Sequence, residues 1–334
     1  MNFNKSFIQA IPSNYEIKNF IGNESHFKKL ELEGIKANTV NKDHQNWSIR
    51  VLSIFFKSIL NSEKNITILT FENYLFPILG LIFMPFLISK NIVMVVHNNV
   101  PGLSKGGLKT KAFKLFVSIC KPKLICLTKS MKDEMIKLGY QKNTVWIPHM
   151  NYKHLKTSSN PDISFDFPDD KINIVLLGRQ AKIFVNHTLP KISNSKFENI
   201  LFHVFHDNVE EYSFSNLLIH KIRPSQAEYQ LILNTCDFVF FPDLEVSLRP
   251  SGILLDCISN YCPIIAPSDG HFKEFENYVI GYSYKNESLI HRLQIIDAVK
   301  SKRITFKKDA FKSCMDKTSI TQFSEKLNAI FSTV

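Results

Sequence analysis

Short apolar runs alternate with longer stretches of mixed polarity along most of the chain. In the first half these runs are continuous and rich in Val and Ile, and they cover residues 66–69, 91–97, 123–127 and 145–147. Continuous β-branched runs are typical of parallel strands that are buried on both faces. The segments near 107–120 and 129–138 are long enough for crossover helices between such strands. This alternation predicts a doubly wound α/β architecture.

A polar segment at residues 152–170 breaks the alternation, with two prolines and no clear period. We interpret it as a linker between two domains. Ser225, with Glu228 three residues later, predicts a capped helix start beyond the linker. The alternation restarts in the second half with a helix at 251–259 and expected strands at 172–177, 199–204, 237–241 and 263–266.

Two segments of the first half need separate interpretation. Residues 15–21 are predicted to form a strand, followed by a loop at Gly22 and Asn23. Residues 74–88 carry no charge, but they are shorter than the roughly 20 residues that a spanning helix needs. Prolines and a glycine also interrupt this run. A buried helix, a segment inserted shallowly into a bilayer surface and a membrane span all remain open for it.

The excess of positive charge lies entirely in the first half. The chain has a formal net charge of +11. Residues 1–160 hold 22 basic and 9 acidic residues, whereas residues 161–334 hold 19 and 21. A basic half indicates an anionic partner such as phospholipid, a phosphorylated acceptor or nucleic acid. The alternative is a solvated lysine surface.

Cysteine usage and hydropathy narrow the class of protein further. The six cysteines form no C-x-x-C pair, and Cys257 and Cys262 are too isolated to predict a zinc site. We therefore expect buried free thiols in a reduced cytosol. The mean hydropathy is near zero, which excludes an integral membrane bundle. We expect no signal peptide, because residues 1–11 hold no apolar run of the required length.

The stretch from 236 to 270 carries the most chemical information. It is predicted to contain a strand, a loop, a helix that begins at Ser251 and Gly252, and a second strand. A helix N-terminus after a strand offers free N–H groups and partial positive charge, and glycine permits close approach, so this is a candidate phosphate site. Asp256 lies one helical turn further on, where a carboxylate can accept from ribose hydroxyls. The alternative is an ordinary N-cap serine and a solvated aspartate.

This stretch resembles the nucleotide-sugar site of glycosyltransferase family 4. Asp256 falls where the family's second glutamate falls, seven residues before the Pro-Ile-Ile-Ala run at 263–266. The resemblance implies that Asp256 holds the donor ribose and that the backbone of Ser251 and Gly252 binds the diphosphate. The family's first glutamate has no counterpart here, and Glu245 is the candidate to replace it.

Two further elements of the second half are similar to the same family. The strand at 172–177 ends in Gly178 and Arg179, with Lys182 three residues on, and resembles the family's cationic G-R-x-x-x-K-G loop in shortened form. Arg179 and Lys182 are then expected to neutralise the leaving diphosphate. Ile222, before the capped helix, lies in the loop that contacts the base through its backbone in the family.

The first half contributes two histidine motifs. His97 and Asn98 belong to a Val-His-Asn-Asn-Val-Pro run that resembles a family motif, and they follow a strand at the edge where ligands bind in α/β sheets. The resemblance implies that these two residues position the sugar. His149, in Ile-Pro-His, resembles a second family motif, but a single histidine is as often structural.

The resemblance implies a GT-B fold, with two Rossmann-like domains whose parallel sheets face a central cleft. By this resemblance, residues 1–155 are expected to form the acceptor-binding domain, with the helix at 319–334 packing back on it, and residues 156–318 are expected to bind the nucleotide sugar. The implied activity is transfer of a hexosyl group from a nucleoside-diphosphate sugar to a saccharide or lipid-linked acceptor in bacterial surface polysaccharide synthesis, with retention of the anomeric configuration. Neither metal nor cofactor is expected. The protein is expected in the cytoplasm, peripheral on the inner, anionic face of the cell membrane.

Two alternatives stay open. One is another nucleotide-sugar enzyme of the same fold, such as an epimerase, and the other is a non-catalytic protein that binds an anionic ligand. Nucleic acid is not expected as a partner, because the aromatic residues do not interleave with the lysines as a base-stacking surface requires.

Overall fold

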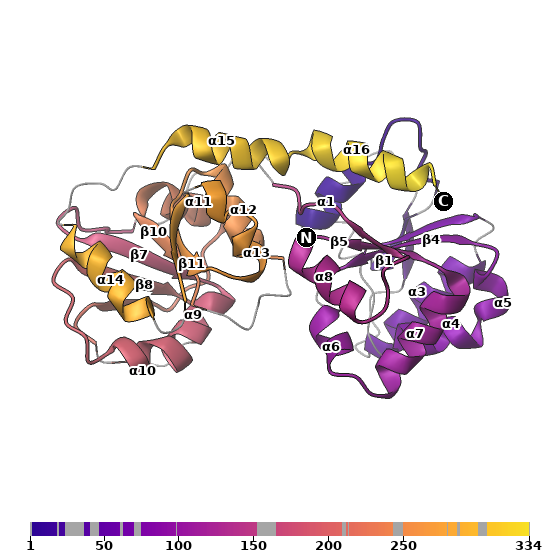
Figure 1. The fold of residues 1–334 in the computed structure, drawn as a ribbon, viewed down its shortest axis with the longest axis horizontal. Coiled ribbons are helices and arrows are strands. Elements are labelled where there is room, and N and C mark those ends of the chain that lie inside the picture. The colour runs from indigo at the N-terminus through magenta and orange to yellow at the C-terminus, as the bar shows by residue number, and fades with distance from the viewer. Residues whose placement is uncertain are drawn as a thin grey trace. The chain divides into compact units, whose positions relative to one another are not determined.

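The structure is a computed structural model of the whole chain (Figure 1). It describes residues 2–18, 20–23, 37–40, 47–60, 63–69, 75–97, 99–151, 165–208, 212, 214–242, 250–278, 280–285, 288–299 and 306–333. The chain divides into two compact units. Unit 1 contains residues 1–150, 248–250 and 318–334, and unit 2 contains residues 151–247 and 251–317. The predicted boundary at 155 lies outside the described residues.

Unit 1 is built on a parallel four-stranded sheet in the order β3-β4-β5-β6. The sheet is in register from Val93 opposite Lys123 to Val96 opposite Cys126 across its central pair. Its strands are β3 (Asn65–Ile68), β4 (Asn91–Val96), β5 (Lys123–Cys126) and β6 (Thr144–Trp146). A separate parallel pair consists of β1 (Phe20–Asn23) and β2 (Ala37–Val40).

The helices of unit 1 bury the apolar strands. Phe3 and Phe7 of the first helix pack against Phe323 of the last one, with ring centroids 6.4 and 5.6 Å apart. The helices are α1 (Asn2–Gln9), α3 (Trp47–Leu60), α4 (Leu75–Ile82), α5 (Met84–Leu87), α6 (Val100–Ser104), α7 (Leu108–Cys120), α8 (Lys129–Lys137) and α16 (Ile320–Phe331). The C-terminal helix therefore belongs to the core of the N-terminal unit.

Unit 2 contains a six-stranded parallel sheet in the order β12-β11-β10-β7-β8-β9. Its strands are β7 (Ile172–Leu177), β8 (Ile200–Phe205), β9 (Leu217–His220), β10 (Phe238–Phe240), β11 (Ile264–Pro267) and β12 (Gly281–Tyr284). The chain runs outward from β7 to β9 and then crosses to β10 on the other side of β7. The topological switch point, where ligands bind in such sheets, is therefore between β7 and β10.

Alternate side chains of the unit 2 strands enter two separate cores. Val175 and Leu177 face one core, whereas Ile174 and Leu176 face the other. The helical segments that cover the sheet are α9 (Arg179–Ile183), the π-helical η1 (Phe184–Thr188), α10 (Leu189–Ile192), α11 (Gln226–Thr235), α12 (Gly252–Ser259), α13 (Gly270–Lys273), the 3₁₀ turn η3 (Glu276–Tyr278), α14 (Leu289–Ala298) and α15 (Lys308–Lys317). Burial on both faces explains why β7 is apolar at nearly every position.

Most predicted elements are found within one or two residues of their expected bounds. The capping box at Ser225 and Glu228 is present, with the serine Oγ and the glutamate carboxylate each accepting a backbone N–H. The strand predicted at 15–21 is wrong in its bounds, because β1 begins only at Phe20. Tyr15 closes a turn onto the carbonyl of Pro12 instead. Gly22 and Asn23 therefore lie inside β1 rather than in a loop after it.

The apolar run at 74–88 forms two short helices, α4 and α5, rather than one buried helix. Phe83 separates them, and Pro85 takes the first turn of the second helix, where proline is favoured. Leu79 and Leu87 are buried, whereas Ile82 and Phe86 are 63% and 56% exposed. Within the described part of the chain, no helix has the length and hydropathy to cross a membrane.

The six cysteines are free and buried, as expected. The Sγ of Cys262 lies 3.6 Å from the Sγ of Cys236, a contact that the sequence did not indicate. The two thiols come from the end of α11 and the start of β11, which the sheet order brings together. The hydrogen bond to Cys262, followed by burial, raises the pKa of the Cys236 thiol well above the ordinary range. The hydrogen bond to Cys236 lowers the pKa of Cys262, but the hydrogen bond to Cys257 and burial outweigh it, so this pKa also lies well above the ordinary range.

Candidate functional site

The carboxyl edge of the unit 2 sheet brings together the segments that the sequence singled out. Gly178 follows β7, Ser251 precedes α12 in the connection from β10, and His271 follows β11. Because β7, β10 and β11 are parallel neighbours, these three segments meet at one edge. The switch point thus coincides with the predicted phosphate site.

Gly178 makes the turn from β7 into α9. Its φ is +55°, a left-handed conformation that L side chains adopt only with strain. A Cβ built on Gly178 would lie 4.0 Å from Cδ1 of Ile253, in the first turn of α12. The turn after β7 therefore packs directly against the start of α12. The prediction that Arg179 and Lys182 lie in a loop is wrong, because both belong to helix α9, which begins at Arg179.

The start of α12 is capped from two sides. The Oγ of Ser251 accepts from the N–H of Leu254 at 3.2 Å, and the N–H of Ser251 donates to Nδ1 of His271 at 3.0 Å. Among the described residues, no acceptor is found for the N–H groups of Gly252 and Ile253. A Cβ at Gly252 would meet nothing within 4 Å, so space is open beside these donors. Two donors at a helix N-terminus with open space beside them can hold an anion.

Asp256 has a protein partner that the sequence did not reveal. Its Oδ2 accepts from the hydroxyl of Tyr229, on α11, at 2.9 Å. Burial raises the pKa of Asp256 to about 6, and the bond from Tyr229 opposes that rise. The pKa of Tyr229 is raised well above its usual range, first by burial and then by the charge of Asp256. One carboxylate oxygen is thus engaged with Tyr229, which fixes the orientation of the group.

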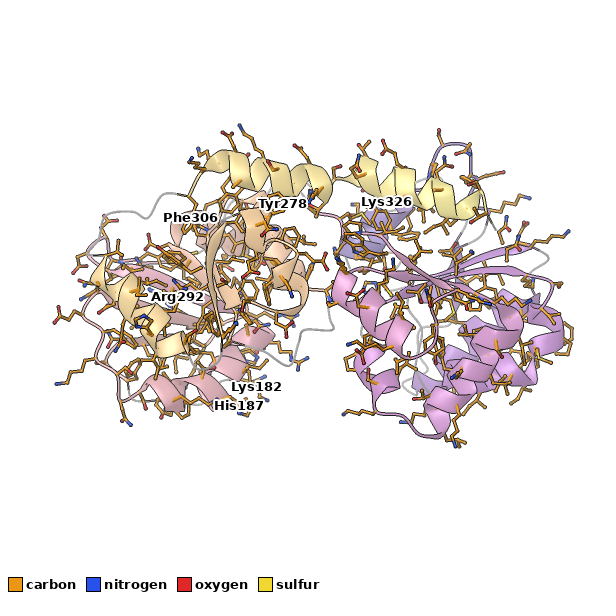
Figure 2. All side chains as sticks on the ribbon, in the orientation of Figure 1. Lys182, His187, Tyr278, Arg292, Phe306 and Lys326 are labelled. Carbon is orange, nitrogen blue, oxygen red and sulfur yellow. The ribbon has the colours of Figure 1, made fainter. Side chains whose placement is uncertain are left out.

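The cations predicted to hold the diphosphate are both exposed. Arg179 opens α9, and Lys182 lies one turn later. Lys182 and His187 extend from the α9–η1 segment in Figure 2. After α9 the helix widens into the π-helical segment η1, which contains His187. Such π-helical turns are frequent at functional sites.

Gln180 is a residue of this region that the sequence did not single out. It lies next to Arg179, its side chain is only 8% exposed, and among the described residues its Oε1 has no hydrogen-bond partner. A buried unpaired acceptor costs roughly 1–3 kcal/mol. Its position two residues after Gly178 was the one available signal in the sequence.

Ile222 lies where the chain leaves β9. Its N–H donates to the carbonyl of His220 at 2.7 Å, and its side chain packs against one core of unit 2. The contact between the Ile222 backbone and a base, which the resemblance implied, stays a prediction. Two other expected site residues, Glu245 and Asn98, lie outside the described residues.

A chain of hydrogen bonds that includes two imidazoles runs across the sheet from β7 through β8 to β9. Nε2 of His203 lies 2.9 Å from Oδ1 of Asn173, whose amide N–H groups donate to the carbonyls of Pro168 and Lys171. His203 must therefore donate from Nε2, and its Nδ1 accepts from Nε2 of His220 at 3.2 Å. Burial, with the neighbouring imidazole second, lowers the pKa of His203 to about 3. Burial also lowers the pKa of His220.

His97 and His149 lie together at the carboxyl end of the unit 1 sheet. The ring of Phe3 contacts both imidazoles, with centroid distances of 4.4 Å to His97 and 5.1 Å to His149. Burial, with His149 second, lowers the pKa of His97 to about 3, and burial lowers the pKa of His149 to about 4. Nδ1 of His149 bonds the carbonyl of Met150 at 3.0 Å, so its proton is on that nitrogen. Both imidazoles are neutral at neutral pH and suit hydrogen bonding better than proton transfer.

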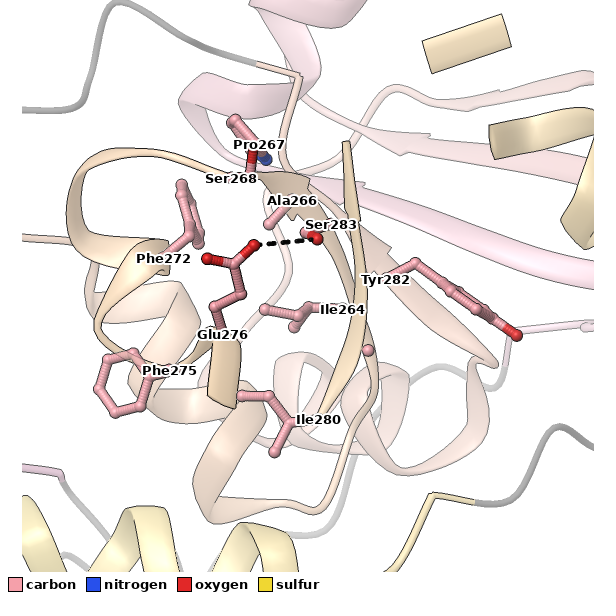
Figure 3. A pocket seen from close by; sticks show the side chains of 11 residues that line it. Ile264, Ala266, Pro267, Ser268, Phe272, Phe275, Glu276, Ile280, Tyr282 and Ser283 are labelled. Carbon is pink, nitrogen blue, oxygen red and sulfur yellow. Dashed lines mark hydrogen bonds between the residues drawn. The ribbon is translucent and has the colours of Figure 1, made fainter. Parts of the chain in front are cut away.

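Two cavities lined by described residues of unit 2 lie away from the predicted phosphate site. A cavity of about 40 Å³ beside β11 and β12, bordered by Phe272, Glu276 and Ser283, holds little more than a water molecule (Figure 3). A cavity of about 540 Å³ is lined by Asp169 and Asp237, which precede β7 and β10, so it lies at the opposite, amino edge of the sheet. Among the described residues, no group of three or more His, Cys, Asp or Glu side chains is placed to hold a metal ion.

Comparison with known proteins places the chain by fold only. None of the protein-family models matches the sequence. No curated protein matches it either. HepE of Anabaena, solved with UDP and glucose, superposes with a TM-score of 0.65 at 12% identity over 93% of this chain and 89% of HepE. A glycosyltransferase from Rickettsia africae gives 0.64 at 12% identity, with 99% and 93% covered.

The N-terminal domain of trehalose-6-phosphate phosphatase from Candida albicans has the same fold, with a TM-score of 0.63 at 11% identity and 99% and 92% of the two chains covered. These likenesses confirm the predicted fold class, an α/β protein with two Rossmann-like units on parallel sheets, as in GT-B glycosyltransferases. At such identities the likeness shows the fold alone, so the activity has to be argued from the site.

Proposed function

We propose that this protein is a glycosyltransferase that takes a sugar from a nucleoside-diphosphate sugar bound by unit 2. The single observation that supports this best is the packing of the Gly178 turn against the first turn of α12 at the switch point of the sheet. That arrangement puts a strand-to-helix turn and a capped helix start side by side, as a bound diphosphate requires.

The diphosphate is proposed to bind the start of α12 at Ser251 and Gly252, through the N–H groups of Gly252 and Ile253. Arg179 and Lys182 are proposed to supply positive charge. As the bond between the sugar C1 and the diphosphate oxygen breaks, negative charge develops on the leaving group. Helix donors and guanidinium groups stabilise such charge. We therefore propose that transfer needs neither a divalent metal nor a cofactor.

The nucleoside is proposed to bind alongside. The second oxygen of Asp256 accepts from a ribose hydroxyl while the first is held by Tyr229. The backbone at Ile222 contacts the base, and Glu245 supports the sugar. HepE was solved with UDP and glucose, so a uridine nucleotide is the first donor to test.

The acceptor is proposed to bind unit 1 at the carboxyl end of β4. His97, neutral at neutral pH, and Asn98 position the reacting sugar through hydrogen bonds. In the transfer, the acceptor oxygen bonds to C1, and the acceptor proton ends on the released diphosphate. We propose that the anomeric configuration is retained, as the resemblance to glycosyltransferase family 4 implies. With no side chain assigned as a nucleophile, retention requires the acceptor oxygen to attack C1 on the face from which the diphosphate departs.

The proposed biological setting is the synthesis of a bacterial surface polysaccharide on a saccharide or lipid-linked acceptor. The +13 balance of residues 1–160 suits an enzyme in the cytoplasm that attaches to the inner, anionic face of the cell membrane. Nucleic acid is the poorer partner, because the aromatic residues of the sequence do not interleave with the lysines as a base-stacking surface requires.

A transfer assay tests the proposal. Nucleotide sugars that carry a radiolabelled hexose are incubated with the protein and a bacterial lipid extract in EDTA. Label should move to the lipid or saccharide fraction, and the nucleoside diphosphate should be released in equal amount. A sugar epimerised without any acceptor would identify an epimerase instead. Nucleotide binding without turnover on any donor would identify a non-catalytic binding protein.

A further inference from the structure

The exposed apolar side chains of the described residues concentrate on four helical segments of unit 1. Six large apolar side chains are more than half exposed, and all six belong to α3, α4, α5 and α7 or the residues that cap them: Leu60, Ile82, Phe86, Ile88, Leu108 and Leu115. We refer to these six side chains as the apolar helix face. The exposed fraction reaches 78% at Leu60 and 80% at Leu108.

The four helices pack beside one another, with α4 in contact with α3, α5 and α7 (Figure 1). The contact with α7 is close, because a Cβ added to Gly80 would lie 2.6 Å from the ring of Phe116. On the other side, the rings of Phe56, on α3, and Phe83, between α4 and α5, lie 5.0 Å apart. The apolar helix face is therefore carried by one continuous helical layer.

Packing among the described residues of unit 1 does not account for these side chains. The helices already bury other apolar residues, including Ile59 of α3, Leu87 of α5 and Phe116 of α7. The outward residues follow helical spacing as well: Ile78 and Ile82 are four residues apart, and Leu108 and Leu115 are seven apart. Each helix thus has one apolar side in the core and another on the surface. An exposed apolar surface of this kind marks an interaction site.

The lysines around the apolar helix face indicate a partner that has both apolar and negatively charged groups. Between Glu72 and Asp133 the chain contains nine lysines and no acidic residue. Lys111 and Lys114 are exposed on α7, between Leu108 and Leu115 in sequence. Lysine side chains beside leucine, isoleucine and phenylalanine are typical of helices that lie in the interface of an anionic bilayer.

We propose that the apolar helix face inserts shallowly into a bilayer that contains anionic phospholipid, with the lysines of α7 contacting the headgroups. Membrane insertion deepens the proposed function, because it would bring unit 1 to a lipid-linked acceptor. Only this purpose rests on the proposed function. Of the three interpretations of residues 74–88, the proposal favours shallow insertion into a bilayer surface. It extends the inserted surface to α3 and α7.

Vesicle co-sedimentation tests the proposal with the full chain. Wild-type protein should pellet with phosphatidylglycerol-containing vesicles and much less with pure phosphatidylcholine. A triple variant, Leu60→Gln, Ile82→Gln and Leu108→Gln, should bind the anionic vesicles at least tenfold more weakly. The three side chains are 63–80% exposed, so the variant should keep the wild-type melting temperature. Lys111→Glu with Lys114→Glu should weaken binding and remove most of its salt dependence.

The matched control substitutes exposed apolar residues outside the face. Leu218→Gln, Ile290→Gln and Ile295→Gln, all in unit 2, should bind vesicles as the wild type does. The proposal is overturned if the wild type does not pellet with anionic vesicles, or if the Leu60, Ile82 and Leu108 variant pellets equally well. A wild type that dimerises without lipid while this variant stays monomeric would also overturn it. UDP calorimetry on the same proteins reports separately on the donor site.

Discussion

At the scale of single residues, Asp256 and Tyr229 determine how the donor site responds to pH. The pKa of Asp256 is about 6, so the carboxylate takes up a proton as the pH falls below that value. A protonated carboxyl loses acceptor capacity for a ribose hydroxyl. We predict that UDP affinity falls between pH 7.5 and pH 5.5, beyond the change caused by the nucleotide's own phosphate.

Asp256→Asn supplies the control, because its amide does not titrate while the phosphate still does. Its affinity at pH 7.5 should be lower by about 1.5–3 kcal/mol, the range for a hydrogen bond to a charged group. In calorimetry, the UDP affinity of Asp256→Asn should change less with pH than the UDP affinity of the wild type. Wild-type affinity together with wild-type melting would remove Asp256 from the site.

Gly178 allows a second prediction at this scale. Alanine at φ +55° costs roughly 1–2 kcal/mol of backbone strain. It would also add an atom between the β7 turn and the start of α12. We predict that Gly178→Ala lowers both the melting temperature and the UDP affinity.

Gly106 is a matched control for that variant, since its φ is +71° and a Cβ there meets nothing within 4 Å. Gly106→Ala, in unit 1, should lower stability to a similar extent and leave nucleotide affinity unchanged. If Gly178→Ala binds UDP as tightly as Gly106→Ala does, the Gly178 turn does not border the ligand.

At the scale of elements, the sequence predicts the parts that repeat one simple pattern. The buried strands, the capping box at Ser225 and the helix start at Ser251 each have a local signal, and they are found as expected. The missed features depend on neighbours that are distant in the chain. Strand β1 is short and has no continuous apolar run, so its start could not be placed.

The same reason explains what was missed in the site. Ser251 and His271 are 20 residues apart, and Tyr229 and Asp256 are 27 apart, and neither pair has a spacing that indicates contact. The order of the strands brings them together. Knowledge of the sheet order would have pointed to His271, because it follows a strand at the carboxyl edge.

At the scale of the whole molecule, buried neutral histidines in both units should make the fold sensitive to acid. The pKa values of His97, His149 and His203 lie at about 3 to 4, below the unfolded value of about 6.5. Their stabilising contribution is complete above pH 6.5 and is lost as the pH falls toward these values. Each group contributes a slope of up to about 1.4 kcal/mol per pH unit.

We therefore predict that the urea midpoint falls steadily between pH 7 and pH 5. His97→Gln should reduce that slope. His187→Gln, at an exposed position in η1, should leave the slope unchanged. A midpoint that is constant over this range would contradict the burial of neutral imidazoles.

The central claim is that a nucleoside diphosphate binds at the carboxyl edge of the unit 2 sheet without metal. Calorimetry in EDTA with UDP, GDP, CMP and dTDP tests it most directly, using wild type, Arg179→Ala and the exposed control Lys191→Ala. At least one nucleotide should bind the wild type and Lys191→Ala equally, and Arg179→Ala should bind it about 1.5–3 kcal/mol more weakly. Binding that requires magnesium or manganese, or equal affinity in all three proteins, would contradict the claim.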